Sequence, residues 1–305
     1  MNAVYVVGSL NMDQTVRVSS LPRPGETVSG SDATFSPGGK GGNQAIAAAR
    51  AGAPVKFTGS VGDDEHGRQI LGVLSGAHID AGSVRLLPSA ATGTAIIAVE
   101  DSGENQIIVS PGANAALTFG DVDTGLATVG AGDVLVLQLE IPIELVRHAA
   151  GLARKAGAFV ILNAAPAPRQ LGGLLEDIDL LVVNEQEIRV LAGLAGTAGG
   201  VRELVTELPP VLGTAIVCTA GAEGSYAVVD GILLHVPAPK VSAKDTTGAG
   251  DTFVGYLAAS LLTDPHDLPA AMVLATRAAA LAVTRSGAME SIPWRRELPA
   301  FPVWR

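Results

Sequence analysis

From residue 130 onward, short apolar runs alternate with longer stretches whose apolar residues recur at helical spacing. Stretch 142–157 predicts a helix, because Pro142 stands near its start and Gly157 at its end. Apolar strands separated by amphipathic helices are typical of a parallel sheet covered on both faces. We therefore expect an α/β fold, doubly wound, with a mostly parallel central sheet and helices on both faces. The expected strands are 133–140 (DVLVLQLE), 158–163 (AFVILN), 179–184 (DLLVVN) and 213–219 (GTAIVCT).

The first third of the chain has a different pattern. Residues 15–30 and 92–110 alternate apolar and polar side chains, and DSGEN at 101–105 predicts a turn within the second segment. Such alternation is typical of antiparallel strands with one solvated face. We expect two inserted segments, approximately 14–36 and 92–110, to form a small antiparallel sheet. This sheet would stand as a lid over the strand ends of a single domain spanning 1–305.

The net charge and the cysteine content of the sequence limit which partners and which cellular compartment are expected. The net charge of −10 and the pI near 4.9 argue against a nucleic-acid or anionic-membrane partner. The N-terminal segment MNAVYVVGSL lacks a basic region and predicts a first strand. The sequence contains no run of 18 apolar residues, so it predicts no membrane span. The single cysteine, Cys218, excludes an intramolecular disulfide. We therefore expect a cytoplasmic protein.

A glycine-rich segment near the C-terminus combines an anion-binding pattern with an acid. In KDTTGAGDTF (244–253), Gly248 and Gly250 precede Asp251, and an apolar helical pattern follows. A flexible loop entering a helix N-terminus favours anions. Asp251 has two interpretations, either as a helix cap or as a reacting carboxylate. The segment lacks the lysine of the Walker A loop and the third glycine of the dinucleotide fingerprint.

A second glycine cluster lies in SPGGKGGNQAIAAARAG, residues 36–52. It has four glycines in the five positions 38–42, around Lys40, and Asn43 opens an alanine-rich helix. A turn before a helix is one interpretation of this pattern. Four glycines exceed what a turn requires, and they permit close backbone approach to a ligand. We expect Lys40 and Asn43 to point at that ligand.

Polar residues end several of the predicted strands. GSLNMD (8–13) would place Asn11 and Asp13 at the carboxyl end of the first strand, unless they form an Asx turn. Glu140 ends another strand, where the alternative is an exposed charge. NEQE (184–187) follows a third strand, with a helix cap as the alternative, and TAGAEG (219–224) follows a fourth. Because ligands bind beyond the carboxyl ends of parallel strands, these groups predict one site.

Taken together, these motifs resemble the ribokinase-type family of carbohydrate kinases over nearly the whole chain. GGKGGNQA (38–45) and DTTGAGDTF (245–253) carry the resemblance, and GSLNMD, RPGETVSG, QLE, NEQE and VTRSGAMESIPW agree in order and spacing. The resemblance implies ATP-dependent phosphorylation of D-ribose to D-ribose 5-phosphate, with Mg²⁺ and an activating K⁺. It also implies a homodimer formed through the β lid. Asp251 would be the base, and the amides of Gly248, Ala249 and Gly250 the anion hole.

The resemblance also implies the remaining site residues, in three groups. The sugar hydroxyls would be held by Asn11, Asp13, Gly39, Lys40, Asn43, Glu140 and Asp251. The nucleotide would be lined by Asn184, Thr219, Gly221, Gly224, Gly250 and Thr276, with Glu187 organising Mg²⁺ through water. The monovalent cation would be held by Asp245, Ser291 and the carbonyls of Thr247, Ala282, Arg285 and Gly287. The sequence departs from the family pattern at Gly42, usually Ala, at Ala220, usually larger and apolar, and at Thr276, often His or Asn.

Other acceptors remain open within the family, such as a fructose-like sugar, a sugar phosphate or a nucleoside. A nucleoside would need aromatic walls, and residues 1–110 contain only Tyr5, Phe35 and Phe57. A sugar phosphate would need more basic residues than the first 45 positions supply, which are Arg17, Arg23 and Lys40. A catalytically silent sugar-binding or regulatory protein would be expected to lack the base or a glycine cluster, and both are present. An oxidoreductase would need a dinucleotide fingerprint after the first strand, where this chain has none.

Overall fold

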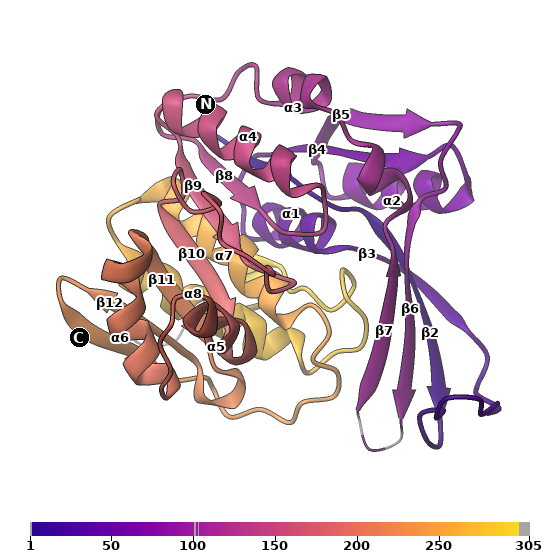
Figure 1. Ribbon diagram of the computed structural model, residues 1–305. Coiled ribbons are helices and arrows are strands. Elements are labelled where there is room, and N and C mark those ends of the chain that lie inside the picture. Colours follow the sequence, from indigo (N-terminus) through magenta and orange to yellow (C-terminus); the bar gives the residue numbers. More distant parts are fainter. Residues whose placement is uncertain (1, 101, 103, 299–305) are drawn as a thin grey trace.

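The computed structural model describes residues 2–100, 102 and 104–298 (Figure 1). A nine-stranded sheet in the order β13-β12-β11-β10-β9-β8-β1-β4-β5 forms its centre. Pairing is parallel from β5 through β11, whereas β12 is antiparallel to both of its neighbours. The expected mostly parallel sheet is therefore confirmed. Its strands are β1 Val4–Val7, β4 Val55–Gly62, β5 Asp80–Leu87, β8 Val134–Leu137, β9 Phe159–Asn163, β10 Leu180–Asn184, β11 Ala215–Thr219, β12 Ser225–Val229 and β13 Ile232–Val236.

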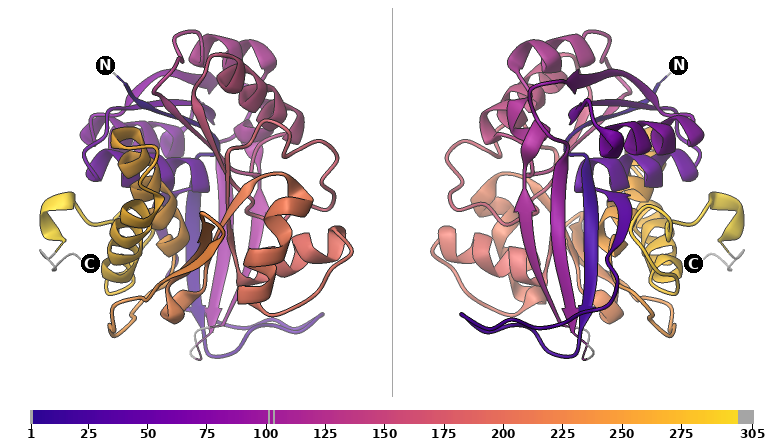
Figure 2. Two further views of the ribbon diagram at one scale, coloured as in Figure 1. Left: turned by 90° about the vertical axis from the view of Figure 1, so that its left-hand side faces the viewer. Right: turned by 90° about the vertical axis from the view of Figure 1, so that its right-hand side faces the viewer.

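Helices cover both faces of this sheet (Figures 1 and 2). One face carries α1 Lys40–Arg50, α2 Glu65–Gly76, α7 Ala249–Thr263 and α8 Leu268–Ala282. The other carries α3 Phe119–Gly125, α4 Ile143–Lys155, α5 Glu185–Leu194 and α6 Val201–Leu212. The described residues also form the short 3-10 helices η1 Gly112–Ala116, η2 Gly221–Glu223 and η3 Arg295–Glu297. Within the described ranges, no helix is long and apolar enough to cross a membrane.

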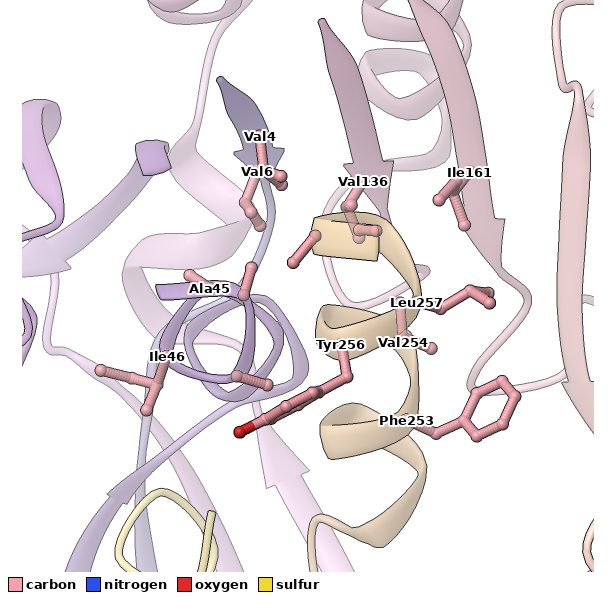
Figure 3. Packing of buried hydrophobic residues seen from close by; sticks show 14 of the residues in the cluster. Val4, Val6, Ala45, Ile46, Val136, Ile161, Phe253, Val254, Tyr256 and Leu257 are labelled. Carbon is pink, nitrogen blue, oxygen red and sulfur yellow. The ribbon is translucent and has the colours of Figure 1, made fainter. Parts of the chain in front are cut away.

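Strand alternation divides the core into two layers. Val4 and Val6 of β1 pack with α1 and α7, whereas Tyr5 and Val7 pack with α3 and α4. Figure 3 shows α1 and α7 side by side under β1, β8 and β9, with Leu257 among the buried side chains. Full burial of each large apolar side chain contributes about 1.5–3 kcal/mol. This packing places the N-terminal ends of α1 and α7 at the carboxyl edge of the sheet, where the predicted site lies.

A second, four-stranded sheet stands apart from the large one in the order β3-β2-β6-β7 (Figures 1 and 2). This separate sheet was expected, and β2–β3 and β6–β7 are antiparallel as predicted. The central pair β2–β6 is parallel, because both strands leave the large sheet in the same direction. The expected turn at 101–105 includes residues 101 and 103, which lie outside the described residues. The bounds are β2 Asn11–Val18, β3 Thr34–Gly38, β6 Gly93–Glu100 and β7 Asn105–Ser110.

The placement of Asn11 and Asp13 at the end of the first strand was wrong. β1 ends at Val7, and after the three residues 8–10 the chain begins β2 at Asn11. Buried Leu10 and Met12 alternate with the two polar residues, which is the period of a strand rather than of an Asx turn. Asn11 and Asp13 therefore lie on the small sheet, close to where it meets the large one.

Candidate active site

The predicted site residues gather where the small sheet meets the carboxyl ends of the large one. A cavity of about 300 Å³ opens between the two, and Asp13 and Ser36 of the small sheet line it. On the other side it is lined by 243–247 together with Gly287 and Ala288. A larger cavity of about 460 Å³ lies at the opposite edge, around Asp133 and Phe159, away from the predicted residues. The smaller cavity is therefore lined by one predicted sugar residue, Asp13, and by three predicted cation residues, Asp245, Thr247 and Gly287.

The first glycine cluster fits α1 against the chain's own backbone. Gly39 precedes α1 with φ 87°, and a Cβ there would lie 2.7 Å from the nitrogen of Asn11. A Cβ on Gly41 would lie 2.7 Å from the nitrogen of Ser9. Glycine is thus required at both positions for the helix start to touch the β1–β2 connection. The glycines were expected to allow close approach of the backbone to a ligand. In the structure they allow close approach of the start of α1 to the backbone of residues 9–11.

Glu140 is fixed at the N-terminus of α1. Its Oε2 accepts hydrogen bonds from Ser9 Oγ at 2.6 Å and from the backbone N–H of Lys40 at 3.1 Å. A carboxylate is stabilised there by the unpaired amides and the dipole of the helix. The structure thus brings Glu140 and Lys40 together from positions 100 residues apart.

Lys40 and Asp13 both lie close to Glu140 and Asp251, and the pKa of each is raised, for different reasons. Burial lowers the pKa of Lys40, but nearby carboxylates, Asp251 first and then Glu140, raise it above its usual value. Burial raises the pKa of Asp13 to about 7, and the charges of Glu140 and Asp251 add to this effect while Lys40 opposes it. Lys40 therefore stays charged, and Asp13 changes charge near neutral pH.

Asp251 lies in the first turn of α7, buried beneath the loop that precedes the helix. Gly248 caps the helix in the left-handed region with φ 71°, so the chain turns sharply into it. The Oδ2 of Asp251 accepts from Asn43 Nδ2 at 2.8 Å, and its Oδ1 accepts from Gln44 Nε2 at 2.9 Å. Both predicted glycine regions therefore meet at one carboxylate.

The amides expected to form the anion hole are only partly free. The N–H of Ala249 donates to the carbonyl of Thr246 at 3.2 Å, closing the turn before α7. The carbonyl of Gly248 accepts from both the backbone N–H and the hydroxyl of Thr252. Gly250 is exposed at the start of the helix, where the positive end of the dipole favours an anion.

The predicted nucleotide residues lie along the ends of β10 and β11. Asn184 and Thr219 are register partners in these strands, and Gly221 and Gly224 follow in the next loop. Thr276 is different: it is buried on α8, and its hydroxyl is hydrogen-bonded to Ser225 at 3.0 Å. Of the predicted nucleotide contacts, Thr276 therefore has the least support from this structure.

Asn184 and Glu187 form the capping box that was the alternative interpretation of NEQE. The side chain of Asn184 accepts from the N–H of Glu187 at 2.8 Å, and Glu187 Oε2 accepts from the N–H of Asn184 at 2.8 Å. Burial raises the pKa of Glu187, against the opposing effects of this N–H and of Lys40. Capping does not exclude ligand contact, because carboxylate oxygens have further lone pairs.

The predicted cation residues come from two loops that meet. Asp245 accepts from the N–H groups of Thr247 and Gly287, each at 2.9 Å. Burial would raise the pKa of Asp245, but these hydrogen bonds hold it below its usual value, so the carboxylate is charged. At the end of α8, Arg285 donates its N–H to the carbonyl of Ala282. The hydroxyl of Ser291 donates to the carbonyl of Ala288 at 2.9 Å.

Several buried polar residues of the site were not among the predicted ones. Each finds its hydrogen-bond partner far along the chain, which no local pattern indicates. Ser9, Gln44 and Gln138 lie within the motifs GSLNMD, GGKGGNQA and QLE, but no role was predicted for them. The missed residues are Ser9, Gln44, Asn114, Gln138 and Asn163.

Comparison with known proteins gives consistent similarities. The sequence model described as "pfkB family carbohydrate kinase" matches residues 1–295. A ribokinase from Haemophilus influenzae is 36% identical over 298 residues, covering 97% of each chain. The crystal structure of ribokinase from Thermotoga maritima superposes with a TM-score of 0.87 at 32% identity, covering 98% of each chain. The structure of Arabidopsis thaliana ribokinase complexed with ribose and ATP has a TM-score of 0.83 at 31% identity, again covering 98% of each.

Proposed function

The chain belongs to the pfkB family of carbohydrate kinases, and from that premise we propose that it transfers the γ-phosphoryl group of ATP to D-ribose, giving D-ribose 5-phosphate. The family resemblance inferred from the motifs is thereby confirmed. The observation that carries the proposal is the hydrogen bond of 2.8 Å between Asn43 and Asp251. It joins the glycine cluster at the start of α1 to the anion-binding start of α7. A sugar held by the first would present a hydroxyl to the carboxylate of the second.

Asp251 is the proposed base. A hydroxyl attacking phosphorus loses its proton as the bond forms, and a carboxylate within reach can accept it. Asn43 and Gln44 each donate to one of the two carboxylate oxygens, which leaves lone pairs for that proton. The exposed helix start at Gly250 stabilises charge on the transferring group.

Both metal ions belong to this proposal. Among the described residues, no group of three His, Cys, Asp or Glu side chains could hold a metal ion by itself. This fits Mg²⁺, which binds largely through substrate phosphates and water, with Glu187 as the acidic group that would hold its water. The charged carboxylate of Asp245, which lies against the loop at Gly287, would hold K⁺ together with the carbonyls predicted from that loop. When bound, Mg²⁺ would neutralise phosphate charge, and K⁺ would steady the loop before α7.

The test is ATP-dependent phosphorylation by the purified protein across D-ribose, 2-deoxy-D-ribose, D-fructose and adenosine. We expect D-ribose to give the highest kcat/KM, with the phosphate on O5 by NMR. A higher value for fructose or adenosine would assign the chain to another acceptor in the same family. Ribose binding without ADP formation from any acceptor would identify a sugar-binding protein instead.

We further propose that two copies pair through the small sheet. Ile96 and Ile108 are cross-strand partners on β6 and β7, exposed by 47% and 67%, and Phe35 on the edge strand β3 is exposed by 54%. Exposed apolar strands at a sheet edge are covered in most stable proteins. Light scattering at micromolar concentration should give a dimer mass, and Ile108→Lys should lower it. A fully active wild-type monomer would contradict pairing.

The activity is placed in the cytoplasm as part of this proposal. The free Cys218 is buried, which is typical of proteins from reducing compartments, and ATP is available there. Cell fractionation with a tagged chain should recover the protein with cytoplasmic markers, and recovery outside the cytoplasm would contradict the placement.

A further inference from the structure

The carboxylate of Asp251 ends a chain of buried amide side chains. Gln44 donates its Nε2 both to Asp251 Oδ1 at 2.9 Å and to Asn163 Oδ1 at 3.0 Å. Its Oε1 accepts from Gln138 Nε2 at 2.7 Å. Gln44 and Gln138 are 0% and 1% exposed, so water does not compete for these bonds. Gln44 is on α1, Asn163 ends β9 and Gln138 follows β8, so three elements converge on one side chain.

A backbone carbonyl sets the direction of this chain. Asn163 Nδ2 donates to the carbonyl of Val182 on β10 at 3.0 Å. A carbonyl can only accept, so Asn163 must turn its oxygen toward Gln44. Gln44 must then present its nitrogen to Asn163 and its oxygen to Gln138. The other hydrogen of that nitrogen is directed at Asp251, as a consequence of the sheet backbone.

Helix packing fixes the distance between Gln44 and Asp251. Gly255 lies one turn beyond Asp251 on α7 and faces α1. A Cβ on Gly255 would lie 2.4 Å from the carbonyl oxygen of Gln44 and 2.4 Å from the Cβ of Ala47. α7 is therefore seated directly on the backbone of Gln44, and Figure 3 shows the two helices side by side.

We propose that Gln44 is a positioning residue for phosphoryl transfer, holding the Asp251 carboxylate in one orientation. The inference rests on the proposed function, because it takes Asp251 as the base. Asn43 would supply both a sugar contact and a second donor, whereas Gln44, fully buried, acts only through Asp251. The charged groups that also face Asp251 are Lys40 of α1, Asp13 of β2 and Glu187 of α5.

The first experiment replaces the donor with an apolar side chain of similar length, Gln44→Met. We expect kcat to fall roughly 10–100-fold, with the KM for ribose changed less than about threefold. A loss in kcat with a nearly unchanged KM distinguishes a misdirected carboxylate from a damaged sugar site. The control is Gln69→Met on the exposed face of α2, which should leave kcat and the KM for ribose unchanged. A kcat within twofold of wild type, or a rise in KM as large as the fall in kcat, would overturn the proposal.

A second pair of variants tests the direction of the chain without touching Asp251. In Gln138→Glu, the new carboxylate can only accept when ionised, so Gln44 must reverse its amide and turn its oxygen toward Asp251. In Gln138→Met, Asn163 still orients the amide of Gln44. We therefore expect kcat at pH 8.5 to fall at least fivefold more in Gln138→Glu than in Gln138→Met. Equal kcat in the two variants would overturn the proposal. This pair remains decisive if Gln44→Met does not fold, as judged by thermal melting.

The Asp251→Asn variant, assayed in parallel, distinguishes a failure of the proposed base from a failure of the proposed positioning role of Gln44. Near-normal turnover in that variant would remove Asp251 from the base role and reject the proposed mechanism. A large loss in Asp251→Asn together with normal behaviour of Gln44→Met would reject only the positioning role.

Discussion

The two halves of the candidate site are built in different ways. On the proposed sugar side, Asn11, Asp13, Asn43 and Asp251 are between 2% and 8% exposed. They are side chains, and most are hydrogen-bonded to other site side chains before any ligand arrives. On the proposed nucleotide side, the predicted residues lie at the ends of β10 and β11, in the turn at 221–224, at the start of α7 and on α8, and Asn184, Gly221 and Gly250 are exposed.

This difference indicates where discrimination occurs. Buried polar groups with fixed partners reject a ligand that leaves them unpaired, and this is how an enzyme discriminates between similar hydroxyl patterns. Exposed loops and a helix start bind a phosphate chain through amides and the dipole, with little demand on side-chain identity. We therefore expect substitutions on the sugar side to have large effects on turnover, and side-chain substitutions on the nucleotide side to have small ones.

The largest effect should come from Asp251→Asn, which tests the sugar side at its reacting atom. The change is nearly isosteric, so ribose and ATP should still bind. We expect kcat to fall roughly 10²–10⁴-fold, the usual contribution of a general base. Steady-state assays with calorimetric binding of both ligands measure this, and weakened ribose binding with unchanged kcat would reverse the assignment.

Removing the cation should have the next largest effect, and it tests a group that touches neither substrate. Asp245 and Gly287 fix the loop that carries the amides before α7, and misplacing those amides is costly in rate. We expect replacement of K⁺ by tetramethylammonium, at constant ionic strength and saturating Mg²⁺, to lower kcat about tenfold. Asp245→Ala should largely abolish this response. Unchanged wild-type turnover without K⁺ would refute the cation site.

The pH dependence of stability gives a test of Asp13, a buried carboxylate on the proposed sugar side. Its pKa is raised to about 7 in the folded state, so between about pH 4 and 7 the folded chain binds more protons than the unfolded one. The contribution of Asp13 to the free energy of unfolding should therefore fall as pH rises through this range. Asp13→Asn cannot titrate, and at pH 8 it should be more stable than wild type by on the order of 2–4 kcal/mol.

Thermal melts of the ligand-free proteins between pH 5 and 8 measure this difference. We expect the advantage of Asp13→Asn to shrink toward pH 5 and to level off above pH 7. Glu187→Gln, at a second buried carboxylate with a raised pKa, is the comparison from the nucleotide side. A stability difference for Asp13→Asn that stays constant with pH would contradict the shifted titration.

The smallest effect should come from Asn184→Ala on the nucleotide side. Its side chain caps α5 through the N–H groups of Gln186 and Glu187, so its loss should lower stability by about 1 kcal/mol. We expect the KM for ATP to rise only about two- to fivefold, with kcat unchanged. Gln186→Ala is the control for exposure alone. A fall in kcat comparable with that of a sugar-side variant would break the contrast between the halves.

The sequence predicted the large sheet well because its signals are local. Apolar runs of strand length, Pro142 and Gly157 all act within one element, and the observed α4 and β8–β11 follow them closely. The start of β2 was misassigned although a signal was present in the alternation of Leu10, Asn11, Met12 and Asp13. This alternation is only four residues long and follows closely after β1, so by itself it does not distinguish a new strand from the end of the first.

The inner support of the site could not be predicted, because its contacts join distant positions. Gln44 meets Asp251 across 207 residues and Gln138 across 94, and although each glutamine lies within a predicted motif, no local spacing indicates these partners. The roles of the predicted site residues stay predictions. The structure nevertheless brings Asn43 to Asp251 and Asp245 to Gly287, which no single motif required.

The short connections between the two sheets give the small sheet the mechanics of a lever. Three residues separate β1 from β2, one residue separates β3 from α1, and β6 starts at Gly93, where a Cβ would meet Asn11 and Asn114. All three strands thus share a pivot at the predicted sugar residues. β2 and β6 have eight residues each, so the far end lies about 26 Å away. A tilt of 10° would carry that end about 4–5 Å while displacing the pivot by a fraction of an ångström, so the sheet would convert a small shift around a bound sugar into a large excursion at its tip.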